Sequence, residues 1–339
     1  MKSVVVRGPI FSKSGYGEHV RCIVRALLSR EDLFDICVVP TVWGNTSWRY
    51  EETEENKKFT HLCEKAQSLQ HRPDISLQVC IPNEWNDMAD LNIGVTAAVE
   101  TTAASHQWLQ YCNHMDHIIV VSDHAKKSLK DPIHTGTFDG KVVDIKCDTD
   151  VDIVGYPVKE YDTVDLDLGL TTDFNFLTVA QDSPRKNLSA TIRSFLNEFK
   201  DDENVGLVLK LNKMNDSLLD REQSKINVRR IIAAEKHQNV KCKIYLLHGP
   251  MTEQEIHSLY KHDSINAYIS TTHGEGYGLP IFEAAYSGLP ILAPAWSGHT
   301  DFLYIPEENK VSKRIKKEAK FLKIRYELKP VQEEAVWEG

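Results

Sequence analysis

The chain alternates short apolar runs with stretches in which apolar residues recur every three or four positions. In the first half the apolar runs span 4–6, 36–40, 76–81, 93–98 and 117–121. In the second half they span 174–180, 205–211, 243–247, 266–270 and 290–293. The longer period occurs near 20–28, 187–200, 217–236 and 252–262. Short apolar runs are typical of buried strands, and the longer period is typical of helices that bury one face. The alternation predicts parallel sheets with helices on both faces.

The length indicates two domains. At 339 residues the chain is long for one compact domain, and two domains of about 150 residues fit it better. We predict a Rossmann-like domain at 1–158, a linker at 159–173, a second doubly wound domain at 174–305 and an extension at 306–339. The ligand of the second domain should lie outside the carboxyl ends of its strands, as in other open α/β sheets.

Two polar stretches of the first half are predicted to be surface loops. One is 46–72, which is rich in charged residues, and the other is the acidic run 148–152. A metal site at the acidic run is the less favoured alternative, because no glycine turn or substrate loop surrounds it. The histidines at 114, 117, 124 and 134 lack the spacing of a zinc-binding helix. We therefore expect no metal site.

Composition describes an ordinary globular protein, with 41% hydrophobic and 26% charged residues. The formal charge of −9 argues against bulk electrostatic attraction to nucleic acid or to an anionic membrane. Seven scattered cysteines without close pairs are typical of reduced thiols in a cytoplasm. The N-terminal apolar run is too short for a signal peptide, and no stretch reaches the length of a membrane span. A soluble, cytoplasmic protein is expected.

The most informative stretch is 270–301, which reads STTHGEGYGLPIFEAAYSGLPILAPAWSGHTD. It follows a predicted strand, turns through Gly274, Gly276 and Gly278, and enters a helix at Pro280. Glycines let the backbone approach a ligand closely, and the amides at a helix start attract phosphate. The turn around Gly276, Tyr277, Gly278 and Leu279 is therefore a candidate phosphate cradle.

Two acids, Glu275 and Glu283, stand eight residues apart around this turn. Carboxylates beside a phosphate site suit a ligand that carries both a diphosphate and hydroxyls, such as a nucleotide-sugar. Their spacing within EGYGLPIFEA resembles the signature of the family-4 retaining glycosyltransferases of the GT-B fold, some of which are phage enzymes. The resemblance implies two domains facing each other across a cleft. It also implies Glu275 on the sugar hydroxyls and Glu283 on the ribose.

A pair of cations follows the first strand of the second domain, at Arg185 and Lys186 in DSPRKN. Fixed cations at a strand end can stabilise the charge that grows on a departing diphosphate. The pair resembles the Arg-Lys-Asn segment with which the family holds the donor phosphates. Lys210 ends the next strand and could substitute for a further family cation or be an exposed strand end. His248 could frame the nucleotide base through backbone groups or belong to a bare turn.

The first domain carries a weaker resemblance. Ser14-Gly15-Tyr16-Gly17 precedes a helix, and the family's equivalent loop faces the donor diphosphate, so Gly15 and Gly17 are candidate ligands. NIGVTAAVETT resembles the acceptor half, but Val99 stands where many relatives have a histidine. Only Glu100 of that pair matches, and it is either an acceptor-side group or a helix-start acid.

The expected function is transfer of a sugar from a nucleotide-diphosphate donor to the hydroxyl of a glycan or small molecule, with retention and without metal or bound cofactor. Between 310 and 325 there are eight basic residues and one acid, Glu318. This basic stretch makes transfer to a hydroxymethylated base in DNA one alternative. A catalytically silent nucleotide-binding module is the other, because the family histidine is missing and the C-terminal end is short. The sequence does not indicate the oligomeric state.

Overall fold

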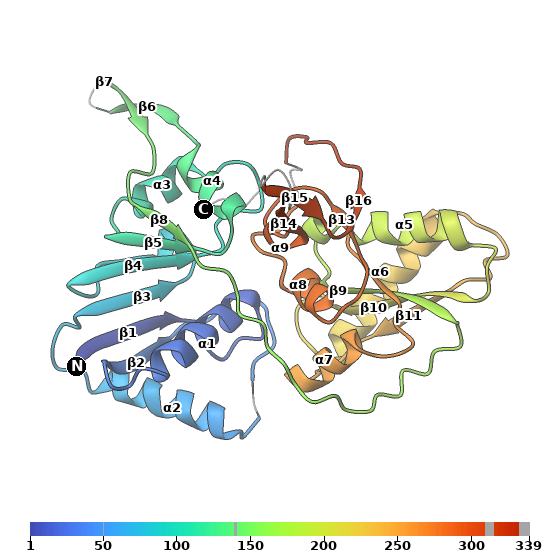
Figure 1. The fold of residues 1–339 in the computed structure, drawn as a ribbon, viewed down its shortest axis with the longest axis horizontal. Helices are drawn as coiled ribbons and strands as arrows, with labels where there is room; N and C mark the ends of the chain where they lie inside the picture. The colour runs from blue at the N-terminus through green and yellow to red at the C-terminus, as the bar shows by residue number, and fades with distance from the viewer. Residues whose placement is uncertain (50, 139–140, 309–314, 332–339) are drawn as a thin grey trace. The chain divides into compact units, whose positions relative to one another are not determined.

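The computed structural model describes the chain except for residues 50, 139–140, 309–314 and 332–339. As far as the structure describes it, the chain divides into two compact units, Met1–Pro157 and residues 158–331. Among the described residues each unit contains a six-stranded sheet, ordered β2-β1-β3-β4-β5-β8 in the first and β11-β10-β9-β12-β13-β16 in the second. Every strand pair within these two sheets is parallel (Figure 1). The prediction of two doubly wound α/β domains is confirmed.

The first unit begins with a buried strand and a capped helix. Val4, Val5 and Val6 in the centre of β1 are almost completely buried. The Ser14 hydroxyl caps α1 by accepting a hydrogen bond from the Gly17 amide. The elements are β1 (Lys2–Gly8), α1 (Gly15–Leu28), β2 (Phe34–Pro40), α2 (Glu54–Gln67), β3 (Ile75–Val79), β4 (Leu91–Thr96), α3 (His106–Cys112), β5 (His117–Val120), α4 (Asp123–Lys130), β6 (His134–Phe138), β7 (Lys141–Ile145) and β8 (Val151–Ile153). Strands β6 and β7 form a two-stranded ribbon that projects from the unit (Figure 1).

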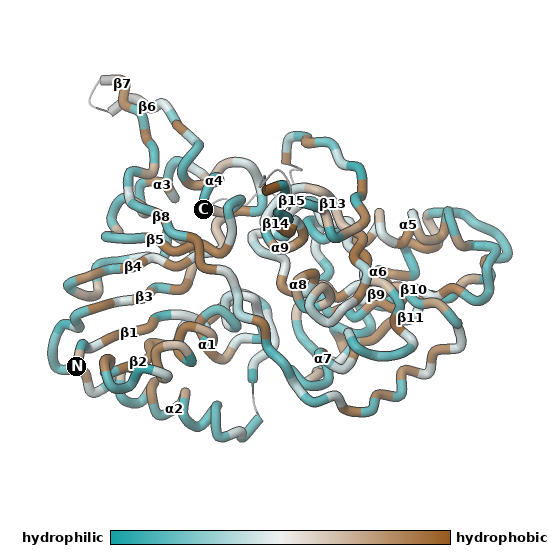
Figure 2. Tube along the Cα trace, in the orientation of Figure 1, coloured by the Kyte–Doolittle hydropathy of each residue, from teal (hydrophilic) through white to brown (hydrophobic). Residues whose placement is uncertain are grey.

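Residues 46–72 are not only a surface loop, because α2 lies within them. Thr53 caps this helix by accepting a hydrogen bond from the Asn56 amide, and Phe59 and Leu62 are buried in the core. The prediction of a surface excursion was wrong here. Only a narrow apolar stripe packs inward, and the rest of α2 is polar (Figure 2).

The acidic run 148–152 was predicted to be a solvated loop, but its last two residues begin the edge strand β8. The Asp152 carboxylate lies 3.0 Å from Nε2 of His117 on the neighbouring strand. Among the residues that the structure describes, no three His, Cys, Asp or Glu side chains are grouped so that they could hold a metal ion.

The second unit repeats the alternation with its own core. Its elements are β9 (Phe174–Gln181), α5 (Leu188–Phe199), β10 (Val205–Asn212), α6 (Leu218–Ala234), β11 (Lys243–Leu247), α7 (Glu253–Tyr260), β12 (Ala267–Ile269), α8 (Leu279–Tyr286), β13 (Ile291–Pro294), α9 (Thr300–Leu303), β14 (Tyr304–Glu308), β15 (Ile315–Ala319) and β16 (Leu322–Ile324). Leu177, Val208 and Tyr268 are buried on the sheet. Apolar residues are concentrated along the strands (Figure 2).

Residues 159–173, predicted to be a linker, form neither helix nor strand and lie along the second unit. Lys159 pairs with Glu253, and the Val164 amide donates to the Ser258 hydroxyl on α7. Leu166, Leu168 and Leu170 pack against the unit's core. This segment is therefore attached to the second unit by specific contacts.

The predicted C-terminal extension contributes to the second unit as far as the structure describes it. Strands β14 and β15 form an antiparallel hairpin, and β16 pairs with β13 at the edge of the main sheet. Part of the basic stretch, 309–314, lies outside the described residues. None of the described helices combines the length and the apolar character needed to cross a membrane.

Candidate functional site

Three loops of the second unit meet at one edge of its sheet. They follow β9, β12 and β13, which are neighbours in the sheet and run parallel, so their carboxyl ends lie together. The loop after β9 carries Arg185 and Lys186, and the loop after β12 carries Glu275. The loop after β13 contains 296–299. This edge is where ligands bind in open α/β sheets.

The centre of the site is a carboxylate held by two cations. Lys186 Nζ donates to Oε1 of Glu275 at 2.6 Å, and Arg185 Nη1 donates to Oε2 at 2.9 Å. Glu275 is only 5% exposed, whereas the Arg185 side chain keeps 33% of its surface open. Burial by itself would raise the pKa of Glu275, but the charges of Lys186 and Arg185 outweigh it and lower this pKa to about 2. The carboxylate is therefore ionised at neutral pH, and the three groups together carry one net positive charge.

The turn that carries the two cations is fixed by Asn187, whose backbone is left-handed at φ 50°. Asn tolerates this conformation better than most residues. Its Nδ2 donates to the Thr271 carbonyl at 3.1 Å, and the Thr271 hydroxyl donates to the Asn187 carbonyl at 2.9 Å. The His273 amide also donates to the Arg185 carbonyl. The cation turn and the Glu275 loop are thus joined along their backbones.

The glycine turn after Glu275 leads directly into α8. Gly278 has φ 93° and is the N-cap residue, and Pro280 lies in the first turn as expected. The Tyr277 ring packs against Phe282 and Phe302, and Tyr277 is only 9% exposed. The Leu279 and Gly276 positions lie on the same turn.

Glu283 lies within α8. Its charge and that of Glu275 both affect the pKa of one buried side chain, Tyr268. Burial raises the pKa of Tyr268 first, and the nearby charges of Glu275 and Glu283 raise it further. Tyr268 is 1% exposed on β12. The role of Glu283 at the ribose stays a prediction.

Lys210 and His248 lie at the ends of β10 and β11, and internal partners engage both side chains. Lys210 Nζ donates to the Gly249 carbonyl at 2.7 Å. Nε2 of His248 lies 2.9 Å from Oδ2 of Asp220, and both side chains are almost fully buried. These contacts fix the loops beside the site, and the His248 ring is not presented at the surface.

The candidates of the first domain belong to the other compact unit. The Gly17 amide donates to the Ser14 hydroxyl at 3.1 Å, and the Gly15 carbonyl accepts a bond from the Tyr156 hydroxyl at 3.3 Å. Glu100 follows β4, where its charge raises the pKa of the buried Tyr16 after the larger effect of burial. The roles of these three residues in donor or acceptor binding stay predictions.

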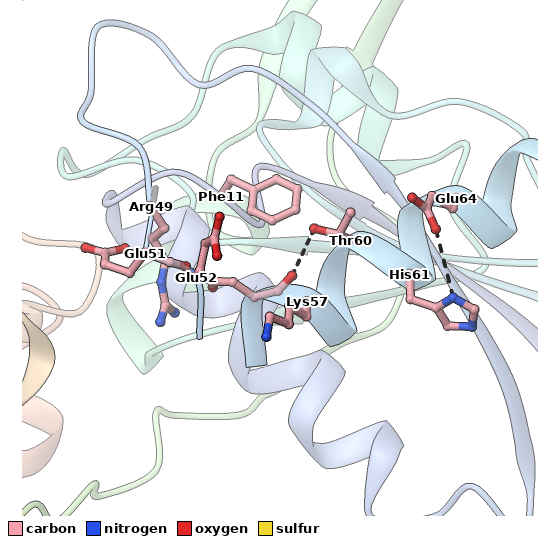
Figure 3. A pocket seen from close by; sticks show the side chains of 9 residues that line it. Phe11, Arg49, Glu51, Glu52, Lys57, Thr60, His61 and Glu64 are labelled. Atoms are coloured by element: carbon pink, nitrogen blue, oxygen red, sulfur yellow. Dashed lines mark hydrogen bonds and ion pairs between the residues drawn. The ribbon is translucent and has the colours of Figure 1, made fainter. Parts of the chain in front are cut away.

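A separate open hollow lies on the first unit beside α2, with a volume of about 340 Å³ (Figure 3). It is lined by Phe11 together with Arg49, Glu51, Glu52, Asn56, Lys57, Thr60, His61 and Glu64. None of the candidates from the sequence contributes to it.

The residues around the cluster that sequence reasoning missed are Trp296, Ser297 and His299. They follow the short strand 290–293, and their place after a strand of the same sheet was the available signal. The Glu275 amide donates to the Ser297 hydroxyl at 3.1 Å, and the Trp296 indole donates to the His273 carbonyl at 3.0 Å. The loop after β13 is therefore hydrogen-bonded to the loop after β12.

Solved structures with the same fold include two sugar-handling proteins. Sucrose-phosphate synthase from Thermosynechococcus elongatus is 13% identical with a TM-score of 0.58, over 91% of this chain and 84% of that protein. The trehalose-6-phosphate protein from E. coli, bound with UDP-2-fluoro glucose, is 11% identical with a TM-score of 0.54, over 89% of this chain and 86% of that protein. Both matches extend over the two units, so the chain has the GT-B type of fold.

S. aureus TarM is matched at 16% identity with a TM-score of 0.47, and this chain spans half of its length. No family model matches the chain, and no curated protein is similar to it in sequence. At these identities the comparisons show the fold, and the activity rests on the chemistry of the site.

Proposed function

We propose that the protein transfers a sugar from a nucleotide-diphosphate donor to an acceptor hydroxyl, with retention of the anomeric configuration. The observation that carries this proposal is the buried Glu275 carboxylate between Lys186 and Arg185 at the carboxyl ends of β9 and β12. The E. coli structure with this fold was solved with the nucleotide-sugar analogue UDP-2-fluoro glucose. Retention is proposed from the resemblance to the family-4 enzymes.

The charges of the cluster suit a diphosphate leaving group. Two cations face one carboxylate, so a net positive charge remains for the donor phosphates. As the bond between the sugar and the diphosphate breaks, negative charge grows on the leaving oxygen, and cations already in place stabilise it without rearranging water. Glu275 would hold sugar hydroxyls and Glu283 the ribose. Amides around Gly276 and Gly278 would complete the cradle.

No metal ion and no bound cofactor is part of the proposal, because Lys186 and Arg185 supply the positive charge that the leaving group needs. Positioning of the donor and charge stabilisation would provide the rate acceleration. The sugar, the base and the oligomeric state are not specified by the residues of the site.

We propose a glycan or small molecule as the acceptor. The DNA alternative relied on the basic stretch, and no observation in the described part of the chain supports it. Within the described part of this stretch, Lys320 pairs with Glu307 and Glu318.

The test is turnover of nucleotide-sugars by the purified chain, with UDP-, GDP-, ADP- and dTDP-hexoses as the panel. We expect hydrolysis or transfer of at least one donor, and a loss of about a hundredfold or more in kcat/KM for Glu275→Ala and Lys186→Ala. Lys243→Ala is the matched control, because Lys243 is exposed at the opposite, amino end of β11. Nucleotide binding without any turnover would instead favour the silent binding module.

A further inference from the structure

The loop after β13 contains a strained serine beside the Glu275 loop. Ser297 has φ 71°, a left-handed conformation that costs a residue with a side chain about 1–3 kcal/mol. Glycine would adopt this backbone at lower cost. Ser297 is nevertheless only 5% exposed, and its hydroxyl accepts a hydrogen bond from the Glu275 amide at 3.1 Å. A strained residue whose side chain contacts the functional loop indicates that the hydroxyl is needed there.

The same loop holds Glu275 from its other side. The Gly298 amide donates to the Glu275 carbonyl at 2.8 Å. The Gly298 backbone also lies so close to the Gly276 carbonyl that a Cβ atom would stand 1.9 Å from that oxygen. Both backbone polar groups of Glu275 are therefore bonded to consecutive residues, Ser297 and Gly298, and the turn has no room to shift towards them.

A fully buried histidine sets the orientation of the serine hydroxyl. His299 Nε2 lies 2.7 Å from the Pro294 carbonyl, which can only accept, so Nε2 carries a hydrogen. Burial lowers the pKa of His299, so the ring is neutral and Nδ1 is an acceptor. The Ser297 hydroxyl lies 3.4 Å from Nδ1 and can donate to it, which leaves its oxygen turned to the Glu275 amide.

We propose that Ser297, oriented by His299, is a positioning residue that fixes the Glu275 loop so that the carboxylate meets Lys186 and Arg185 in the geometry that receives the donor sugar. This inference rests on the proposed function. Nothing in the sequence pattern assigns a role to either residue, and neither side chain needs to touch the donor. The chain of bonds runs from the Glu275 amide to Ser297, from Ser297 to His299, and from His299 to the Pro294 carbonyl.

The decisive variant is Ser297→Gly, because it removes the hydroxyl and relieves the backbone strain at the same time. We expect the melting temperature to be unchanged or higher, while kcat for the best donor of the panel falls about tenfold to a hundredfold. The Kd of the matching nucleoside diphosphate should change less than threefold, because that ligand lacks the transferred sugar that Glu275 would hold. Asn239→Gly is the matched control, since Asn239 also has a positive φ of 55° but is exposed and distant in sequence.

A double-mutant cycle separates this role from general packing. If the bonds act as one chain, His299→Leu lowers kcat in the wild type but has little further effect in the Ser297→Gly background. His299→Asn, whose side-chain oxygen can accept from Ser297 in place of Nδ1, should retain more kcat than His299→Leu.

Two outcomes would overturn the inference, and they differ from failure of the proposed function. An active wild type with unchanged kcat in Ser297→Gly refutes the positioning role alone, and so do fully additive losses in the cycle. A wild type that turns over no donor of the panel refutes the proposed function and this inference together.

Discussion

Burial raises the pKa of the Glu275 carboxyl, and two neighbouring cations lower it by more. A carboxyl with this burial and no partner would take up a proton rather than stay charged. Here the pKa falls to about 2 because Lys186 and Arg185 lie within hydrogen-bond distance. Glu275 therefore carries a negative charge that its two cationic neighbours stabilise.

The first prediction concerns this pKa. A folded-state pKa of about 2, below the ordinary value of 4.5, stabilises the fold above about pH 4.5, and this contribution is lost as the pH falls towards 2. The wild type should exceed Glu275→Gln in free energy of unfolding by about 3 kcal/mol from pH 7 down to about pH 5, and by progressively less as the pH falls from there to 3. Urea denaturation over this pH range measures the difference.

Glu54→Gln serves as the control for that measurement, because the Glu54 side chain is 92% exposed and its replacement should alter stability little. A difference between wild type and Glu275→Gln that stays constant from pH 7 to pH 3 would show that the Glu275 carboxyl is not held ionised by its partners.

At the scale of single elements, the start of α8 joins backbone conformation to the site. Gly278 and Gly288 bound this helix, and their φ angles are nearly equal at 93° and 91°. Their surroundings differ, because a Cβ at Gly278 would lie 3.1 Å from Cβ of His299, whereas a Cβ at Gly288 would meet nothing within 4 Å.

This pair gives a matched experiment. Gly288→Ala should lower the free energy of unfolding by about 1–2 kcal/mol through backbone strain alone, and leave donor turnover unchanged. Gly278→Ala should lose at least as much stability and also lower kcat, because the added methyl group presses on His299 beside the Glu275 loop. Denaturation and turnover assays check both; equal kinetic effects of the two substitutions would contradict the account.

The elements also show where sequence reasoning succeeded and where it could not. Arg185, Lys186 and Glu275 were predictable as one group, because each follows a strand of a parallel sheet and such strand ends meet at one edge. Helix α2 was missed because only a narrow stripe around Phe59 and Leu62 is apolar. Ser297 escaped because its role depends on a hydrogen bond to a loop 22 residues away and on a backbone angle that no pattern encodes.

For the whole molecule, each unit has its own buried core residues, and this separation accounts for the two predicted domains. One core gathers around Val4, Val6 and Phe59, and the cores of the second unit gather around Leu177 and Leu207. Each sheet is covered by its own helices, which is why the alternation of strand and helix patterns was sufficient to predict the architecture. The side-chain partners of His248 and Lys210 were not predictable, because Asp220 lies in the first turn of α6 and Gly249 in the loop after β11.

The central claim is that the second unit binds a diphosphate through Lys186 and Arg185. Calorimetric titration with nucleoside diphosphates tests this claim most directly. The wild type should bind one of UDP, GDP, ADP and dTDP. Lys186→Ala should raise the Kd for that diphosphate at least tenfold, whereas Lys243→Ala should leave this Kd unchanged. The corresponding nucleoside, which lacks phosphate, should not distinguish wild type from Lys186→Ala. Equal affinity of wild type and Lys186→Ala for the diphosphate, or an equal loss in Lys243→Ala, would contradict the account.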